Sequence, residues 1–205
     1  MLNELERRVV DLTYENKATH LSSSLEAVNV IASIYSVMTD SEVFVLGNAH
    51  AAMALYAVLE KRGLGVAQQL YEKHGTHQAR DVEHGIWVTG GSLGQAETLA
   101  VGIALADRQR NVYLLTSDGA CAEGSVWEAL RIARDQQLEN LRITVLANGH
   151  GALGPIDADD LEARLNAFYP TMVIRSNVFN FPEWMQGLAG HYVVMNKEQY
   201  EEITK

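Results

Sequence analysis

The chain has 205 residues, 47% of them hydrophobic, and a formal net charge of −10. This length fits one domain with a sizeable core, and the negative charge argues against nucleic acid or an anionic membrane as the main partner. No apolar stretch reaches the ~20 residues of a membrane span, and the charged, amphipathic N-terminus differs from a signal peptide. The single cysteine, Cys121, excludes an internal disulfide. We therefore expect a soluble, cytoplasmic protein.

The pattern of apolar residues predicts helices alternating with strands in a single domain over residues 1–205. Helical spacing occurs at 2–16, 25–38, 51–61, 66–73, 96–107, from about 123, and at 158–168 and 182–188. Short β-rich runs occur at 42–46, 112–116, 141–147, 172–176 and 192–195. This alternation predicts the α/β class: a doubly wound, mainly parallel sheet of five to six strands with helices on both faces.

Two oxygen-bearing side chains follow neighbouring strands of this predicted sheet. Asp118 and Gly119 come shortly after the strand at 112–116, and Asn148 comes directly after the strand at 141–147. In a parallel sheet both side chains would lie at the carboxyl edge, where open α/β folds bind ligands. Hard oxygens suit Mg²⁺ or Ca²⁺, and a glycine lets the backbone approach an anion closely. A metal ion with a diphosphate is the simplest occupant.

The spacing of these residues resembles the thiamine-diphosphate motif of the transketolase family. The resemblance rests on Asp118-Gly119, on Asn148 thirty positions later, and on Glu-Gly and Trp-Glu-Ala between them. It implies that Asp118, Asn148 and the main-chain carbonyl of His150 hold Mg²⁺, which in turn clamps the diphosphate of the cofactor. Two positions differ from the family pattern: Ser117 replaces a glycine, and Leu146 replaces a common aspartate.

Two further segments resemble cofactor-contacting segments of the same family. The glycine-rich run from Thr89 to Gln95 is similar to a signature that passes over the cofactor rings. The resemblance implies that Gly91, Ser92 and Leu93 lie against the cofactor, with Leu93 as the apolar contact. The run Gly-Asn-Ala-His at 47–50 is similar to the family's Asn-Gly-His segment, with Ala49 replacing a glycine. His50 would donate a hydrogen bond to the diphosphate.

Two more histidines follow in family order. Thr19-His20 occupies the place of a Gly-His-Pro-Gly segment, and Thr76-His77-Gln78 that of Gly-His-Pro-Glu. The resemblance implies that His20 and His77 face the substrate and act as catalytic residues, and histidine suits proton exchange near neutral pH. It places Glu123 within the cofactor site, at the contact with a partner's pyrimidine-binding domain.

The resemblance covers only the diphosphate-binding domain, over about residues 15–176. In transketolases a glutamate in a separate domain binds the pyrimidine ring across a subunit interface, and the family's later substrate-facing histidine has no clear match after Pro170. We therefore expect a second subunit that carries the pyrimidine-binding and C-terminal domains, forming a heterotetramer. Apolar helical surfaces near 21–38 and 123–133 are the predicted interface.

The resemblance thus implies a transferase that is active only with its partner and moves a two-carbon ketol unit between sugars, either phosphorylated or nucleotide-linked. Two alternatives remain open. One is the α-type subunit of a 2-oxo-acid dehydrogenase first component, which shares the Asp-Gly and Asn pattern. The other is a catalytically silent cofactor-binding or regulatory homologue, which Ser117, Ala49 and Leu146 favour.

Overall fold

The computed structural model describes residues 2–151, 153–176 and 181–205. Contacts between residues divide the chain into two compact units, each of which is described by itself. Unit 1 comprises residues 2–36, 49–78 and 181–205, and unit 2 comprises 37–48, 79–151 and 153–176. The single domain inferred from the sequence stays a prediction.

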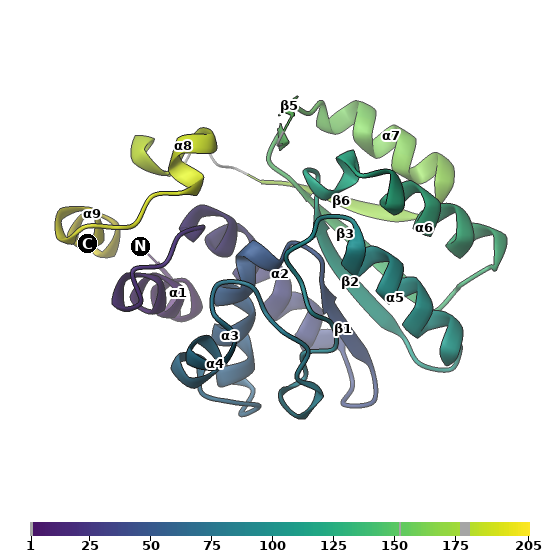
Figure 1. Ribbon diagram of the computed structural model, residues 1–205, viewed down its shortest axis with the longest axis horizontal. Helices are drawn as coiled ribbons and strands as arrows, with labels where there is room; N and C mark the ends of the chain where they lie inside the picture. Colours follow the sequence, from purple (N-terminus) through teal and green to yellow (C-terminus); the bar gives the residue numbers. More distant parts are fainter. Residues whose placement is uncertain (1, 152, 177–180) are drawn as a thin grey trace. The chain divides into compact units, whose positions relative to one another are not determined.

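Unit 2 is built on a four-stranded parallel sheet with the order β1-β2-β3-β6. Its strands are β1 (Val43–Leu46), β2 (Val112–Ser117), β3 (Leu141–Ala147) and β6 (Thr171–Arg175). In register, Val43 is opposite Val112, and Val112 is opposite Leu141. The carboxyl ends of β2 and β3 consequently lie side by side at one edge of the sheet (Figure 1).

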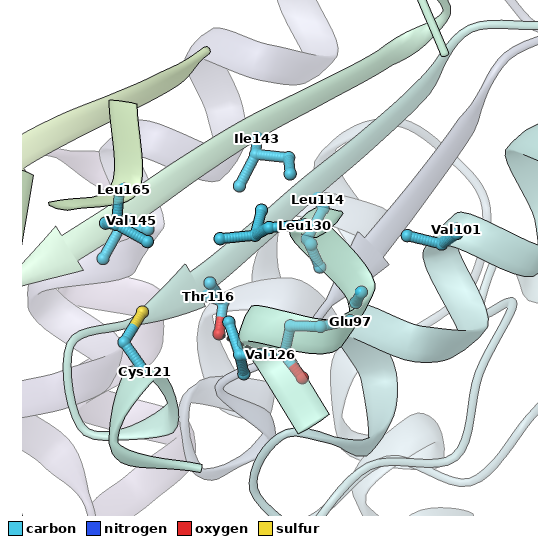
Figure 2. Close-up of a pocket in the computed structure, with 11 residues that line it drawn as sticks. Glu97, Val101, Leu114, Thr116, Cys121, Val126, Leu130, Ile143, Val145 and Leu165 are labelled. Atoms are coloured by element: carbon cyan, nitrogen blue, oxygen red, sulfur yellow. Dashed lines mark hydrogen bonds between the residues drawn. The ribbon is translucent and has the colours of Figure 1, made fainter. Parts of the chain in front are cut away.

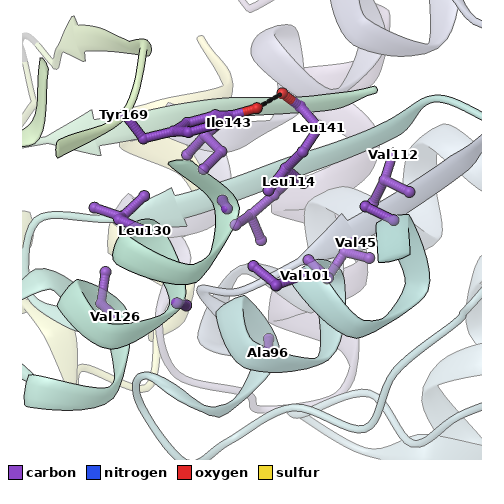
Figure 3. Close-up of a cluster of buried hydrophobic side chains, with 14 of the residues drawn as sticks. Val45, Ala96, Val101, Val112, Leu114, Val126, Leu130, Leu141, Ile143 and Tyr169 are labelled. Atoms are coloured by element: carbon purple, nitrogen blue, oxygen red, sulfur yellow. Dashed lines mark hydrogen bonds between the residues drawn. The ribbon is translucent and has the colours of Figure 1, made fainter. Parts of the chain in front are cut away.

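Three helices contribute to the core of unit 2: α5 (Gln95–Ala106), α6 (Gly124–Asp135) and α7 (Ala158–Phe168). Alternate strand residues point to one face of a sheet, and those on one face here pack with apolar helix residues (Figure 3). This core includes Val45, Val112, Leu114, Ile143, Ala100, Val101, Val126, Leu130, Leu161 and Leu165. The hydroxyl of Tyr169 donates to the carbonyls of Leu138 and Leu141, so its buried polar group is satisfied.

The connections in unit 2 include two 3₁₀ turns and a small hairpin. The turns are η2 (Val82–His84) and η3 (Ala120–Ala122). The hairpin pairs β4 (His150–Gly151) with β5 (Gly154–Pro155) in antiparallel orientation, in the connection that follows β3. The chain after Asn148 therefore reverses direction within this hairpin.

Unit 1 is helical. Its elements are α1 (Glu4–Glu15), α2 (Leu21–Val37), η1 (Ala49–Ala51), α3 (Ala52–Lys61), α4 (Ala67–His74), η5 (Glu183–Met185), α8 (Gly187–His191) and α9 (Lys197–Thr204). Arg8 of α1 donates two hydrogen bonds to Glu60 of α3, which also accepts from the main-chain N–H of Ala67 at the start of α4. One half-buried carboxylate therefore joins three helices.

The predicted α/β class with a mainly parallel sheet is confirmed. Among the described residues, however, the main sheet has four strands and not five or six. The strand predicted at 192–195 is wrong, because this segment is irregular chain between α8 and α9 and pairs with no strand. None of the described helices is long and apolar enough to cross a membrane.

Candidate functional site

Asp118 lies at the carboxyl end of β2 with its side chain buried. Its Oδ1 accepts a hydrogen bond from the main-chain N–H of Gly119 at 2.9 Å, and Oδ2 accepts from that of Gly149 at 2.8 Å. The second bond ties the turn after β2 to the turn after β3. Burial raises the pKa of Asp118, and the amide donors of Gly149 and Gly119 oppose this change.

Asn148 and His150 lie in the turn after β3. Oδ1 of Asn148 accepts from the main-chain N–H of His150 at 3.0 Å, and the His150 ring donates to the Asn148 carbonyl at 3.0 Å. The carbonyl oxygen of His150 lies near Gly119, because a Cβ built on that glycine would be 3.7 Å from it. The structure therefore brings the three predicted metal-binding groups to one edge of the sheet.

The chemistry of these groups fits a hard divalent cation. They offer a carboxylate, an amide oxygen and a main-chain carbonyl, which are ligands that Mg²⁺ and Ca²⁺ accept. Both carboxylate oxygens of Asp118 accept amide hydrogen bonds, and a carboxylate has about four lone-pair sites in all. Within residues 2–151, 153–176 and 181–205, no three His, Cys, Asp or Glu side chains are grouped so that they could hold a metal. A site here would therefore depend on amide and carbonyl oxygens.

The glycine-rich loop precedes α5. Gly91 and Ser92 are exposed, and Leu93 is half-buried. Gly94 has φ +77°, and a Cβ at that position would lie 2.8 Å from Cβ of Glu123, the residue that begins α6. This close packing places the end of the loop beside Glu123, in the segment that follows Asp118.

The predicted histidines gather in unit 1. The ring centroid of His20 lies 5.7 Å from that of His50 and 5.8 Å from that of His77. A fourth histidine, His191 of α8, is 4.2 Å from His20 and 5.1 Å from His50. Nδ1 of His191 lies 3.3 Å from the hydroxyl of Ser23. We refer to His20, His50, His77 and His191 as the histidine cluster.

Burial keeps the inner members of this cluster uncharged. Desolvation, with contributions from neighbouring histidines, lowers the pKa of His20 to about 4 and that of His50 to about 3. It lowers the pKa of His191 as well. These three imidazoles are therefore neutral at pH 7, and each can donate one hydrogen bond and accept another.

His191 is the member that sequence reasoning misses. The apolar pattern predicts a short helix that ends at 188 and then a strand, whereas α8 continues to His191. The Gly190-His191 pair at the end of a helix is the available signal. A histidine after a glycine is too common to be singled out without its spatial neighbours.

The helical surfaces predicted as an interface are mostly polar where they are exposed, apart from Val37 at the end of α2, which is 67% exposed. On α6 the apolar side faces the core, and Glu128, Arg131 and Asp135 form ion pairs on its exposed side. On α2 the large apolar residues are mostly buried. In contrast, α5 exposes Leu99 and Leu105, by 41% and 36%. In unit 2 the exposed apolar residues thus include two on α5, besides Met172 of β6 at 63%, and the interface near 21–38 and 123–133 stays a prediction.

Comparison with known proteins identifies relatives of the chain. The model of the family "Transketolase, thiamine diphosphate binding domain" matches residues 27–174. One subunit of an apulose-4-phosphate transketolase from Phocaeicola vulgatus is 29% identical over 158 residues, covering 66% of this chain and 55% of its own. A "6-deoxy-6-sulfo-D-fructose transketolase subunit SqwG" from a Clostridium species is 31% identical, covering 60% of this chain and 52% of its own.

A solved structure shares the fold. The transketolase of Leishmania mexicana aligns with a TM-score of 0.70 at 19% identity, over 84% of this chain and 35% of the transketolase. The chain thus spans a little over half the length of the two relatives above and about a third of this full-length enzyme.

Proposed function

The chain belongs to the family of transketolase thiamine-diphosphate-binding domains, and from this premise we propose that it is the diphosphate-binding subunit of a two-chain, transketolase-like enzyme. With its partner, the enzyme would transfer a two-carbon ketol unit between sugars. The observation that carries the proposal is the meeting of Asp118, Asn148 and the His150 carbonyl at the ends of β2 and β3. In this proposal the protein is cytoplasmic and residues 1–205 belong to a single thiamine-diphosphate-binding domain.

Asp118, Asn148 and the His150 carbonyl would hold Mg²⁺, and Ca²⁺ could replace it because the donors are all oxygens. The ion neutralises and orients the diphosphate of the cofactor. The main chain at Gly119 and the imidazole of His50 would hold the diphosphate oxygens. Thiamine diphosphate, when bound, supplies the nucleophilic carbon that breaks and re-forms the bond beside a ketose carbonyl.

The remaining predicted residues have distinct roles in this proposal. Gly91, Ser92 and Leu93 would line the ring system, with Leu93 as its apolar contact. His20 and His77 would contact hydroxyl groups of the sugar and move protons there, and the position of His191 in the cluster assigns it to the same group. Neutral imidazoles suit the contact with sugar hydroxyls because each can donate one hydrogen bond and accept another.

The partner would supply what the described residues do not include. Two relatives carry the word "subunit" in their names, which supports a second chain with the pyrimidine-binding and C-terminal domains in a heterotetramer. Leu99 and Leu105 on α5 are candidates for the contact, since exposed apolar residues on one helix favour burial against a protein. Glu123, which packs against the loop before α5, would lie at the same contact.

A catalytically silent homologue is the second candidate, and one observation favours it. Two of the positions that differ from the family pattern, Ser117 and Leu146, are opposite each other in the register of β2 and β3. An apolar residue therefore lies next to the candidate metal site where relatives commonly have a carboxylate. Binding of thiamine diphosphate without any turnover of ketoses would support this alternative. Turnover of 2-oxo acids with a lipoyl acceptor would instead support the dehydrogenase component.

The central test is the Asp118→Ala variant, assembled with its partner chain. We expect its Kd for thiamine diphosphate in the presence of Mg²⁺, measured by calorimetry, to rise at least about 100-fold, because a charged ligand of the ion is lost. Asp135→Ala, which changes an exposed aspartate on α6, is the matched control and should bind normally. Unchanged affinity in Asp118→Ala would remove the basis of the proposal.

A further inference from the structure

Glu97 is a buried carboxyl group in the first turn of α5, with only 2% of its surface exposed. The hydroxyl of Thr116, near the end of β2, donates a hydrogen bond to Oε1 of Glu97. The other oxygen, Oε2, has no hydrogen-bond partner among the described residues. A buried carboxyl with one unmatched oxygen is costly in a core, and nothing in the proposed cofactor chemistry uses it.

The carboxyl borders a small cavity between the helices and the sheet (Figure 2). Its volume is about 10 Å³, which is close to the room that one water molecule needs. Apart from Glu97, Thr116 and Cys121, the lining is apolar and includes Val101, Leu114, Val126, Ile143 and Leu165. The lining is too apolar to supply the two or more hydrogen bonds that a buried water needs, so the cavity offers Oε2 no compensating polar group.

The end of β1 packs against the same pair of side chains. A Cβ built on Gly47 would lie 2.8 Å from both Oε1 of Glu97 and Oγ1 of Thr116. Gly47 also donates its N–H to the carbonyl of Leu115 at 2.7 Å, extending the pairing of β1 with β2. Glu97 thus contacts the ends of two neighbouring strands, and Thr116 is two residues before Asp118.

The described residues that line this cavity include no cation to compensate a negative charge on Glu97. Desolvation raises the pKa of Glu97, and the hydrogen bond from Thr116 only partly opposes this change. The other titratable group in the lining is the Cys121 thiol of η3, whose pKa burial also raises. The charge of Arg164 on α7 lowers the pKa of Cys121 somewhat, but Arg164 does not contribute to the pKa shift of Glu97. The uncharged carboxyl is therefore the form that fits this cavity.

We propose that Glu97 is a positioning residue for the cofactor site, holding the ends of β1 and β2 together through Gly47 and Thr116 and so fixing the turn that carries Asp118. The inference rests on the proposed function, in which Asp118 binds the metal. An uncharged carboxyl accepts the Thr116 bond through Oε1 and leaves no charge on Oε2. An ionised one would place a charge in an apolar cavity and weaken the arrangement.

The test compares Glu97→Leu, Glu97→Gln and Thr116→Val in the full chain by amide hydrogen exchange. The probes are the N–H groups of Gly119 and Gly149, which bind Asp118. We expect about tenfold faster exchange of these two amides in Glu97→Leu and Thr116→Val, with the amides of α7 unchanged. Glu97→Gln should exchange like the wild type, because the amide keeps both an acceptor and a donor.

The exposed Glu128 of α6 provides the control variant Glu128→Gln, which should alter none of these rates. Unchanged rates at Gly119 and Gly149 in both Glu97→Leu and Thr116→Val would overturn the proposal. A uniform acceleration throughout unit 2 would overturn it as well, since that is the result of a purely structural role. If either Glu97→Leu or Thr116→Val fails to fold, the exchange rates of the other variant still test the proposal.

A pH profile provides a readout that simple packing would not change. Because the pKa of Glu97 is raised in the folded chain, its contribution is complete below the ordinary value of 4.5 and is lost as pH rises through the raised value. Exchange at Gly119 relative to α7 should therefore increase more steeply with pH in the wild type than in Glu97→Gln, because any contribution from Asp118 is common to both proteins. Loss of cofactor binding in Asp118→Ala is measured separately, so a wrong cofactor assignment and a wrong role for Glu97 give different results.

Discussion

The imidazole of His20 is held by its backbone as well as by its neighbours. His20 has φ +66°, donates its N–H to the His191 carbonyl at 3.0 Å, and its carbonyl accepts from the N–H of Ser24 at 3.1 Å. Left-handed conformations are uncommon for residues other than glycine, although asparagine adopts them more readily. Asparagine at this position therefore offers a way to remove the imidazole with little change in the turn that begins α2.

The low pKa of His20 predicts a pH dependence of stability. Its folded pKa of about 4 lies below the ordinary value of 6.5, so the unfolded chain binds the proton more readily between these values. The stabilisation is complete above pH 6.5 and is lost as pH falls toward 4. We expect the urea midpoint to drop between neutral and mildly acidic pH in the wild type and to drop less in His20→Asn. Equal drops in both proteins would contradict the assigned environment of His20.

Sequence reasoning brings Asp118 and Asn148 together because each follows a strand directly and parallel strands end at the same edge. That logic is local and needs no knowledge of side-chain packing. The contact between His20 and His191 cannot be predicted in this way. The two residues are far apart in the sequence, and only the tertiary structure brings their rings together. Glu97 is likewise invisible in the sequence, because only the contact with Thr116 distinguishes it from an ordinary carboxylate in the first turn of a helix.

At the scale of elements, most helices and strands could be predicted because their apolar residues follow one clear period. α3 and β3 lie within one residue of the expected bounds. The strand was expected at 192–195 because Val193 and Val194 have high β propensity. The prediction failed because a strand needs a neighbouring strand to pair with, and this segment has none. α2 begins at Leu21, earlier than expected, since Ser22, Ser23 and Ser24 lie inside the helix and do not cap it.

Helix α5 provides a matched pair of glycine substitutions. Gly94→Ala would place a methyl group in a left-handed position and 2.8 Å from Cβ of Glu123. We expect this change to lower the free energy of unfolding by more than about 1 kcal/mol. Gly102→Ala lies in the same helix with no atom near the added Cβ, and should raise the free energy of unfolding by about 0.5–1 kcal/mol. Chemical denaturation measures both, and the same sign for the two would contradict the contact at Gly94.

At the scale of the whole molecule, the exposed side of α5 predicts where the partner binds. Leu99→Glu places a charge among apolar contacts that assembly would bury, so we expect complex formation to weaken at least about tenfold. The control is Ser41→Glu, which adds the same charge at an exposed polar residue before β1. Light scattering after size-exclusion chromatography of the mixed chains distinguishes the two variants. Normal assembly of Leu99→Glu would exclude this face of α5.

Because its single cysteine is buried, the chain carries a natural probe of local opening motions. Cys121 is buried, and burial raises the pKa of its thiol to about 12, so the native protein presents almost no reactive thiolate. A thiol reagent can alkylate it only during the moments when the interior around the cavity opens. The labelling rate, followed by mass spectrometry, would therefore measure the free energy of that opening in a native, untagged chain.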